Sequence, residues 1–373
     1  MRIGITCYPS HGGSGVVATE LGKLLAENGH EVHFITYEMP FRLGNFHQNI
    51  FYHEVEANQY ALFKFPPYDL ALASRMAQVA IDHKLDLLHV HYAVPHAVAA
   101  VLAKQMVGDH LKVVTTLHGT DITVLGEDPT LKGIIKFGLE KSDMVTAVSD
   151  SLIQQTYDMF HVKVPIERIY NFVDERVYYP RDVQSIRRQY VSDEEKILLH
   201  ISNFRPVKRP KDVVDIFHRV QEKVPSHLLL VGEGPELMNI HQQVIDLGIQ
   251  DRVHFLGKQN EVAQLISLAD LLLLPSEKES FGLVALEAMA CGVPTVGSAT
   301  GGVPELVKQG ETGYLANVGD VPAMAESAID ILSHPHLHEK MVSNGLERAS
   351  KHFSGSAITK QYEALYQRLL QQD

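Results

Sequence analysis

The stretch DLLLLPSEKESFGLVALEA, Asp270–Ala288, decides the fold class of this chain. Its run of consecutive leucines is short and apolar, which is typical of a buried strand in a parallel sheet. A polar loop follows, and Phe281-Gly282-Leu283 then begins an apolar helical pattern. A strand, a loop and a helix in this order make one unit of an α/β protein, in which helices cover a parallel sheet.

The same alternation of β-rich runs and helical patterns continues along almost the whole chain. Expected strands lie at residues 2–8, 30–37, 85–92, 112–119 and 144–150, and again at 196–204, 227–234, 252–258, 270–276 and 293–299. Expected helices lie at 16–28, 71–83 and 95–107, and later at 322–332, 335–352 and 357–371. Two such series predict two Rossmann-like domains that face a cleft.

A polar and irregular stretch at residues 174–193 separates the two series. We therefore expect a first domain at 1–173, a junction at 174–193, a second domain at 194–354 and a C-terminal helix at 355–373. In open parallel sheets, ligands bind at the carboxyl ends of the strands. The informative residues should therefore lie just after each strand.

The composition excludes several classes of protein. The chain has 373 residues, with 33 Lys and Arg against 45 Asp and Glu, and its net charge of -12 gives no general affinity for nucleic acid or anionic lipid. Cys7 and Cys291 are too few for a disulfide framework. The N-terminus lacks the apolar run of a signal peptide, and no stretch approaches the roughly 20 apolar residues that span a membrane. We expect a cytoplasmic protein without a membrane partner.

The first strand leads into the glycine loop SHGGSG, Ser10–Gly15, which precedes a helix. Free backbone N–H groups at such a position can hold a phosphate or a carboxylate. Residues 13–18 also satisfy the dinucleotide fingerprint G-x-G-x-x-A, and Glu38 follows at a distance suited to a ribose contact. A nicotinamide-dependent oxidoreductase is therefore an alternative, although residues 9–11 lengthen the loop beyond the usual tight turn.

Two cations follow the first strand of the second domain. Arg205 and Lys208 lie in the loop SNFRPVKR, Ser202–Arg209. An isolated basic pair is ordinarily part of a solvated loop. At the carboxyl end of a strand, however, both cations could meet a diphosphate.

Several histidines raise the question of a metal site: His89, His91, His96 and His118. His89 and His91 point to the same face of a strand, and no carboxylate or cysteine stands at ligand spacing nearby. No two aspartates are two positions apart, so the D-x-D pair of metal-dependent transferases is missing. We expect no metal and no cofactor. His118 differs from the others because, at a strand end beside Gly119, it could contact a substrate.

Two glutamates flank the start of the helix in the opening stretch. Glu279 precedes it, and Glu287 follows about two turns on amid apolar neighbours. At about 1.5 Å per residue the offset is roughly 12 Å, comparable to the span from a sugar ring across a diphosphate to a ribose. One carboxylate could bind sugar hydroxyls and the other the ribose diol, with the N–H groups of Phe281–Leu283 opposite the diphosphate. An acidic first turn would explain Glu279 alone.

These residues form a family signature. Glu279 and Glu287, with the blocks FRPVKR, VGEGPE, FLGK, EAMACGVP and GGVPELV in order, resemble the family 4 retaining glycosyltransferases. The resemblance implies a GT-B fold, a nucleoside-diphosphate sugar donor, no metal, and a final helix that crosses back to the first domain. The apolar stripe Ile358, Tyr362, Leu365, Tyr366 and Leu369 suits that docking. The implied donor-binding residues are Gly15, Asn203, Arg205, Lys208, Gly232, Leu256, Glu279, Phe281, Gly282, Leu283 and Glu287.

The first domain narrows this resemblance. CYPSHGGSG, HVHYAVPHA, VTTLHGTDIT and YNFVDERVY are similar to the L-malate-using N-acetylglucosaminyltransferases of bacillithiol biosynthesis. The similarity implies transfer of N-acetylglucosamine from UDP-N-acetylglucosamine to the hydroxyl of L-malate. The visible departure is His11, where a small apolar residue is expected. A small dianion needs several converging donors, and the candidates are Gly13, Ser14, Tyr92, Thr116 and Asn171.

A lipid or polysaccharide acceptor is the alternative within the same family. A lipid acceptor would predict a basic amphipathic or aromatic-rich face on the first domain. The segment NQYALFKFPPY, Asn58–Tyr68, is rich in aromatic residues but carries a single lysine. We expect it to be a packed loop.

For the reaction, the family resemblance implies retention of the α configuration, and no carboxylate is placed for a covalent double displacement. We expect front-face attack by the malate hydroxyl as the diphosphate departs, with a phosphate oxygen taking the proton. The expected catalytic residues are His118, Arg205, Lys208 and Glu279. The sequence leaves the oligomeric state open, a homo-oligomer included.

Overall fold

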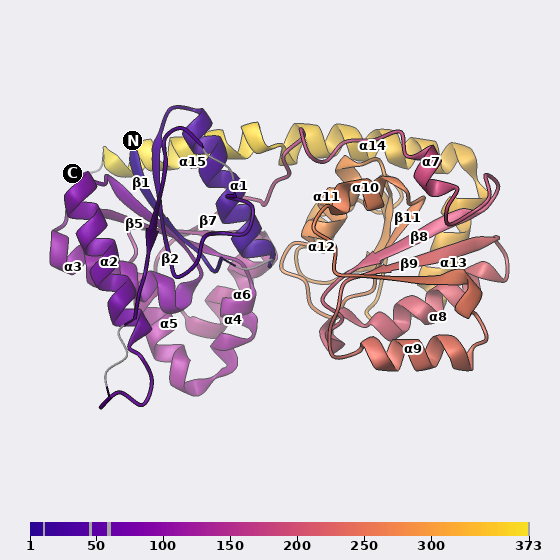
Figure 1. The fold of residues 1–373 in the computed structure, drawn as a ribbon, viewed down its shortest axis with the longest axis horizontal. Coiled ribbons are helices and arrows are strands. Elements are labelled where there is room, and N and C mark those ends of the chain that lie inside the picture. Colours follow the sequence, from indigo (N-terminus) through magenta and orange to yellow (C-terminus); the bar gives the residue numbers. More distant parts are fainter. Residues whose placement is uncertain (10–11, 45–46, 58–60, 372–373) are drawn as a thin grey trace. The chain divides into compact units, whose positions relative to one another are not determined.

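The structure, a computed structural model, describes residues 1–9, 12–44, 47–57 and 61–371 (Figure 1). The chain divides into two compact units. Unit 1 comprises Met1–Asn171 together with Gly355–Asp373, and unit 2 comprises Phe172–Ser354. Each unit is built on a parallel sheet with helices between the strands, which confirms the predicted pair of Rossmann-like α/β domains.

The sheet of unit 1 has, within the described residues, seven parallel strands in the order β3-β2-β1-β4-β5-β6-β7. They are β1 (Arg2–Thr6), β2 (Glu31–Thr36), β3 (Ile50–Glu54), β4 (Leu87–His91), β5 (Lys112–Leu117), β6 (Met144–Ala147) and β7 (Ile166–Arg168). The sequence predicts all of these except β3 and β7, which are the two edge strands. Edge strands are less buried, so neither of them carries the continuous apolar run that marks the inner strands.

The helices of unit 1 follow the strands in regular alternation. They are α1 (Gly13–Glu27), α2 (Tyr68–His83), the π-type segment η1 (Ala93–Ala97), α3 (Val98–Val107), α4 (Thr120–Thr123), η2 (Leu125–Glu127), α5 (Pro129–Lys141), α6 (Asp150–Phe160) and α15 (Gly355–Leu370). On one face of the sheet, α2 and α3 bury a core that includes Ile35, Leu72, Leu88 and Val113. The burial of such apolar side chains is the main term that stabilises the unit.

The sheet of unit 2 has, in the part of the chain that the structure describes, six parallel strands in the order β10-β9-β8-β11-β12-β13. They are β8 (Lys196–Ile201), β9 (Ser226–Val231), β10 (Val253–Gly257), β11 (Leu271–Leu274), β12 (Thr295–Ser298) and β13 (Gly313–Ala316). The sequence misses only β13, which again is an edge strand and mostly half-buried.

Helices and short turns connect these strands. They are α7 (Gln184–Arg187), η3 (Pro206–Lys208), α8 (Pro210–Gln221), α9 (Leu237–Asp246), η4 (Gln250–Arg252), α10 (Val262–Ser267), α11 (Leu283–Ala290), α12 (Val303–Leu306), α13 (Val321–Ser333) and α14 (Pro335–Phe353). Phe217 of α8, Leu230 of β9 and Ile331 of α13 belong to one buried cluster, which holds these elements on the sheet. The quoted stretch Asp270–Ala288 is β11, its loop and most of α11, as predicted.

The last helix, α15, belongs to unit 1 although the preceding helix, α14, belongs to unit 2. Its predicted apolar stripe is buried throughout, and the Tyr366 hydroxyl bonds to His89 Nδ1 of β4 at 2.7 Å. The predicted return of the C-terminal helix to the first domain is therefore confirmed. Among the described residues, no helix is both long and apolar enough to cross a membrane.

The aromatic-rich segment before α2 differs from its prediction. Asn58 to Tyr60 lie outside the described residues, but the rest of the segment is not a packed loop. Leu62, Phe63 and Phe65 are 82%, 51% and 75% exposed. The expectation of packing was wrong because composition alone does not say whether a loop has a neighbouring surface to bury its apolar side chains.

Each sheet reverses its chain order at one place. In unit 1 the order turns between β1 and β4, and in unit 2 it turns between β8 and β11. The loops that leave two such strands diverge to opposite faces of the sheet, and ligands of open α/β sheets bind between them. The two reversals therefore mark where functional residues should gather.

Candidate functional site

At the reversal in unit 2, an ion pair joins the two loops that flank it. Lys208 ends η3 after β8, and Glu279 lies in the loop after β11. Lys208 Nζ donates to Glu279 Oε1 at 2.5 Å, and the Ser276 hydroxyl donates to the same oxygen at 3.0 Å. The two charged side chains are 24% and 13% exposed, so water screens the pair less than it screens a surface pair. The structure brings these two predicted catalytic residues together.

The backbone around Glu279 is held by a glycine in the loop after β12. Gly302 N donates to Glu279 O at 3.1 Å. A Cβ on the preceding Gly301, whose φ is +53°, would lie 1.6 Å from that same oxygen. Only glycine allows this close approach, so the GGVPELV block fixes the position of Glu279.

Another close approach holds the loop after β8. A Cβ on Gly232 would lie 1.8 Å from Ser202 O, and one on Gly234 would lie 1.9 Å from Asn203 O. The glycine loop after β9 therefore lies directly against the loop that carries Asn203 and Arg205. These last two predicted donor residues are exposed.

The remaining predicted donor residues of unit 2 lie near the carboxyl end of β10, immediately before α11 or within α11. Leu256 is half-buried in β10, and its carbonyl accepts from Gln259 Nε2 at 2.6 Å. Gly282 has φ +89° and lies immediately before α11, which begins at Leu283 as predicted. Phe281 is buried, with its ring against Phe353, and contact of its backbone with the donor stays a prediction.

Glu287 lies inside α11, where the neighbouring residues are buried as well. Glu287 is only 7% exposed, which agrees with its apolar neighbours in the sequence. Burial of a carboxylate is costly unless hydrogen bonds or a ligand satisfy it. Whether Glu287 holds a ribose diol stays a prediction.

At the reversal in unit 1, aromatic residues meet. The Tyr8 ring, after β1, lies edge-on to the Tyr92 ring, after β4, with centroids 5.1 Å apart. The backbone of Tyr92 has φ +96°, a conformation that residues other than glycine rarely adopt. Such strained residues cluster at functional sites. Burial, and then the neighbouring Tyr92, raises the pKa of Tyr8 to about 12, so its hydroxyl keeps its proton.

The predicted acceptor residues other than Tyr92 and Thr116 lie at the start of α1, after β1, and near the end of β7. Gly13, Ser14 and Gly15 form the first residues of α1, and exposure falls along them from the exposed Gly13 to the buried Gly15. His11 lies outside the described residues. Asn171 is 8% exposed at the end of the first segment of unit 1.

A hydrogen-bonded array of neutral histidines runs through the sheet of unit 1. His118 Nε2 lies 2.8 Å from His91 Nδ1, and the His91 and His89 rings have centroids 4.4 Å apart. Burial lowers the pKa of His89 and of His118 to about 3, so both rings are neutral at pH 7. The His118 ring is also stacked at 6.0 Å from Tyr92, so the array ends beside the aromatic pair.

Thr116 is fully buried within this array. Its hydroxyl lies 2.7 Å from His89 Nε2, 2.7 Å from the Thr146 hydroxyl and 3.4 Å from the Tyr362 hydroxyl. These contacts tie β4, β5, β6 and α15 together. Contact of Thr116 with the acceptor stays a prediction, and its observed partners give it a role in positioning the array.

Asp121 holds the loops after β4 and β5. Its Oδ1 accepts from Gly119 N at 2.8 Å and from His118 N at 3.3 Å, and its Oδ2 accepts from Ala93 N at 3.1 Å. Burial raises the pKa of Asp121 to about 6, although the backbone bonds oppose the shift. Asp121 therefore fixes the backbone that carries His118.

Comparison with known proteins agrees with this arrangement. Residues 11–177 match the family described as Glycosyltransferase Family 4, and residues 182–348 match the family described as Glycosyl transferases group 1. The chain is 56% identical over 374 residues to N-acetyl-alpha-D-glucosaminyl L-malate synthase of Bacillus anthracis, an alignment that covers 100% of this chain and 98% of the relative. The chain belongs to the family 4 glycosyltransferases. The oxidoreductase alternative is therefore dropped.

Solved structures show the same fold for this glycosyltransferase. Anabaena Alr3699/HepE in complex with UDP and glucose superposes with a TM-score of 0.83 at 22% identity, and covers 99% of this chain and 100% of its own. A sucrose-phosphate synthase from Thermosynechococcus elongatus superposes with a TM-score of 0.81 at 24% identity, and covers 99% of both chains. At these identities the likeness shows the GT-B fold alone.

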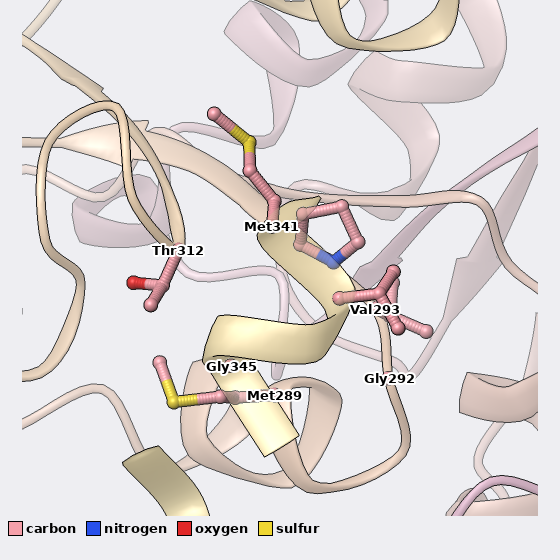
Figure 2. Close-up of a pocket in the computed structure, with 8 residues that line it drawn as sticks. Met289, Gly292, Val293, Thr312, Met341 and Gly345 are labelled. Carbon is pink, nitrogen blue, oxygen red and sulfur yellow. The ribbon is translucent and has the colours of Figure 1, made fainter. Parts of the chain in front are cut away.

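A small depression in unit 2 of this glycosyltransferase is not part of the candidate site. It lies between the end of α11 and α14, and Figure 2 shows Met289 and Met341 among the side chains that line it. The depression leaves no room for a water molecule, and none of the predicted donor residues lines it. It is therefore a packing feature between two helices.

Three residues that support this glycosyltransferase site were not predicted from the sequence, because they form no recognisable charge pattern. Tyr8, Asp121 and Gly301 each stand within quoted blocks of the sequence but received no role. Their roles depend on what approaches them in space, such as the Glu279 carbonyl beside Gly301. Each of them follows the carboxyl end of a parallel strand (β1, β5 and β12), and that position is the signal that could have found them.

Proposed function

We propose that this glycosyltransferase transfers N-acetylglucosamine from UDP-N-acetylglucosamine to the hydroxyl of L-malate, the first step of bacillithiol biosynthesis. The observation that carries the proposal is the identity of 56% to the N-acetyl-alpha-D-glucosaminyl L-malate synthase of Bacillus anthracis over 100% of this chain. Acceptor choice differs between enzymes that share a fold, so likeness along the whole chain supports it better than likeness of the donor half alone.

For the donor, we propose a binding surface on unit 2 at the reversal between β8 and β11. The exposed Arg205 guanidinium can pair with diphosphate oxygens in a bidentate way, which a lysine cannot do. Lys208 would add positive charge while its bond to Glu279 keeps both side chains in place. Glu279 keeps a second carboxylate oxygen with which to accept from sugar hydroxyls.

For the acceptor, we propose the residues at the reversal in unit 1. Ser14, Tyr92 and the first N–H groups of α1 supply donors for a dianion, and the start of a helix favours negative charge. His118 is neutral, so it can donate or accept a hydrogen bond at the donor sugar without adding charge. Asp121 and His91 would keep that ring in position.

The chemistry that we propose needs no metal. The malate hydroxyl oxygen forms the new bond to the sugar C1 while the bond from C1 to the diphosphate oxygen breaks. The hydroxyl proton passes to the departing diphosphate, and attack on the same face retains the α configuration. Arg205 and Lys208 stabilise the charge that develops on the leaving group, the role that preorganised cations usually play.

The test is an acceptor panel. The purified protein is incubated with UDP-N-acetylglucosamine and a series of hydroxy acids, and UDP release is followed. L-malate should give the fastest release and a product with the mass of the N-acetylglucosaminyl malate conjugate. Release at the same slow rate with every hydroxy acid would overturn the acceptor assignment.

A lipid acceptor is the second candidate, because the loop with Leu62, Phe63 and Phe65 exposes apolar side chains. Such a loop could meet a lipid surface. The same panel therefore includes vesicles that carry lipids with free hydroxyl groups. Transfer to vesicle lipid, and none to L-malate, would favour this candidate. We place the malate reaction in the cytoplasm because both of its proposed substrates are soluble metabolites.

A further inference from the structure

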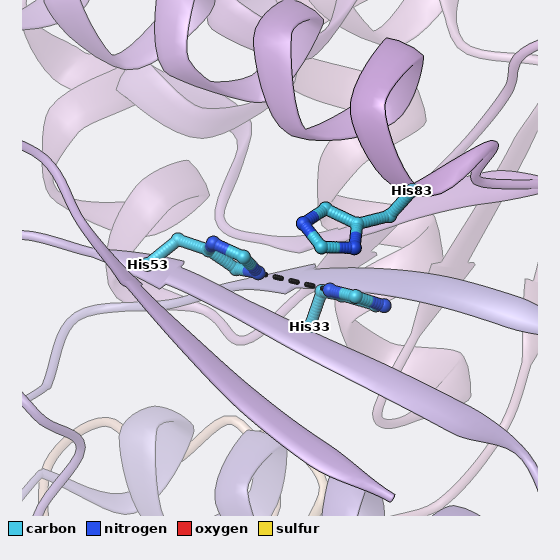
Figure 3. Close-up of side chains that lie close together, drawn as sticks. All are labelled: His33, His53 and His83. Carbon is cyan, nitrogen blue, oxygen red and sulfur yellow. Dashed lines mark hydrogen bonds between the residues drawn. The ribbon is translucent and has the colours of Figure 1, made fainter.

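Three histidines of unit 1 lie together on the face of the sheet that α2 covers. His33 comes from β2, His53 from β3 and His83 from the last residue of α2 (Figure 3). Each offers one ring nitrogen, and these nitrogens lie within 4.8 Å of one another. His33 Nδ1 and His53 Nε2 are 2.9 Å apart. Residues far apart in the sequence thus converge on one point.

A carboxylate orients the innermost of these rings. His33 is fully buried, and its Nε2 lies 2.9 Å from Glu31 Oε1. A carboxylate oxygen only accepts, so His33 donates from Nε2 to Glu31. The Nδ1 atom is then left with its lone pair toward His53 and His83. Histidine ligands of metal ions are oriented by carboxylates in this way.

Binding of an ion changes the proton positions in this pair. Because His33 Nδ1 keeps its lone pair, His53 Nε2 donates to it, and the His53 proton must move from Nε2 to Nδ1 before that ring can bind an ion. His53 and His83 are half-buried, so an ion can reach the cluster and keep water as a further ligand.

The distances require only a small adjustment. Nitrogen ligands lie about 2.0–2.1 Å from Zn²⁺, so two of them in a tetrahedral site are roughly 3.4 Å apart. The His33 and His53 nitrogens would separate slightly, and the widest separation, at most 4.8 Å, would close by about 1.4 Å. His83 ends its helix and can supply that movement by a ring rotation.

We propose that His33, His53 and His83 form a site for a transition metal ion, with Zn²⁺, Ni²⁺ or Cu²⁺ as the ions that imidazole suits. Three neutral nitrogens without a thiolate favour these ions over Mg²⁺ or Ca²⁺. The ion would join the edge strand β3 to β2 and α2. An edge strand has one sheet neighbour only, so such a link would stabilise it.

The site is separate from the transfer reaction. None of the three histidines is a proposed donor or acceptor residue, and β1 separates β2 and β3 from β4, so the cluster lies outside the reversal in unit 1. The expectation of a transfer reaction that needs no metal is therefore unaffected. The proposed ion would therefore have a structural role and not a catalytic one.

The competing interpretation is a stacked cluster that binds nothing. His33 lies parallel to Phe51, with centroids 4.9 Å apart, and the bond between His33 and His53 satisfies one nitrogen of each ring. Such a cluster would be stable without an ion. The two interpretations differ in whether affinity for metal depends on all three rings.

The experiment uses the whole chain, stripped with a chelator and titrated with Zn²⁺ by calorimetry and with Co²⁺ by visible absorption. One equivalent should bind, with the absorption of a four-coordinate Co²⁺. His53→Gln and His83→Gln should each weaken binding by more than the roughly 10- to 100-fold expected for Glu31→Gln, which removes only the partner of a ligand. Metal should also raise the melting temperature of the wild-type chain but not of either histidine variant.

A matched control is available in unit 2. His227 and His254 also stack, with His227 Nδ1 and His254 Nε2 3.0 Å apart, but they are a pair and not a trio. His254→Gln should leave the one-equivalent binding unchanged. The proposal is overturned if the wild-type chain binds no stoichiometric metal. It is equally overturned if His53→Gln and His83→Gln bind as tightly as the wild type, since other histidines would then account for the binding. Melting of the stripped variants shows whether they are folded.

Discussion

The Lys208 ammonium lies 2.5 Å from the Glu279 carboxylate, and this bond connects the loop after β8 to the loop after β11. The two loops flank the place where the chain order of the sheet reverses. The proposed donor residues are therefore held in position before a ligand arrives. Such preorganisation reduces the cost of arranging charges during a reaction.

The first prediction concerns Lys208. Lys208→Met removes a charge-assisted hydrogen bond and one of the proposed leaving-group cations, and a bond of this kind contributes about 1.5–3 kcal/mol. If that loss falls on the transition state, kcat/KM for the donor should fall roughly ten- to hundredfold. Initial rates of UDP release at varied donor concentration measure it. Lys211→Met, at an exposed position of α8, is the control and should change nothing. If Lys208→Met and Lys211→Met have the same kcat/KM for the donor, Lys208 is not part of the donor site.

The second prediction concerns Gly301. Gly301→Ala places a methyl group 1.6 Å from the Glu279 carbonyl oxygen, so the Glu279 loop must move. We expect a large loss of transfer with the fold retained, measured by initial rates together with melting. Gly310→Ala is the matched control, because Gly310 also has a positive φ, +72°, but its added carbon would meet Tyr314 only at 3.9 Å. If both variants keep full activity, the position of Glu279 does not matter for transfer.

The third prediction concerns Thr116. Thr116→Val keeps the shape of the side chain but removes the buried hydrogen bonds of Thr116 to His89 Nε2 and to the Thr146 hydroxyl, at a cost of about 1–3 kcal/mol. The melting temperature should fall. If Thr116 also binds the acceptor, the KM for malate should rise while donor affinity stays the same. Ser14→Ala, at a half-buried position, should raise the KM for malate without the fall in melting temperature. Unchanged melting of Thr116→Val would contradict its role in the histidine array.

The fourth prediction concerns the pH dependence of stability that His96 causes. Burial lowers the pKa of His96 from its ordinary value of 6.5 to about 4. Between these values the unfolded chain binds a proton that the folded chain does not bind. The stability that the neutral ring contributes is therefore complete above about pH 6.5 and is lost as the pH falls toward 4.

His96→Gln removes this titration, so its free energy of unfolding should depend less on pH, by up to about 1.4 kcal/mol per unit between pH 4 and 6.5. Urea unfolding at a series of pH values measures the slope. His336→Gln, at a fully exposed histidine, should keep the wild-type slope. Identical slopes for the wild type and His96→Gln would show that His96 does not titrate differently in the folded chain.

The inner strands and several helices, such as α1, α14 and α15, could be predicted from the sequence, because both carry strong local patterns. β11 reads as an apolar run and Gly282 marks the start of α11. The edge strands β3, β7 and β13 could not be predicted, since their partial burial depends on where they stand in the sheet. The same limit applies to the candidate site. Charged residues such as Lys208 could be predicted from their residue type and their position after a strand. The hydrogen bonds of Asp121 and the close contact of Gly301 could not, because they depend on how the chain folds.

The central claim is that the donor is UDP-N-acetylglucosamine and the acceptor is L-malate. The most direct measurement is the mass and anomeric configuration of the product formed from these two substrates in the presence of excess chelator. The account predicts one product, an α-linked N-acetylglucosaminyl malate, formed together with one equivalent of UDP. A β-linked product, hydrolysis of the donor without transfer, or transfer that requires added metal would contradict it.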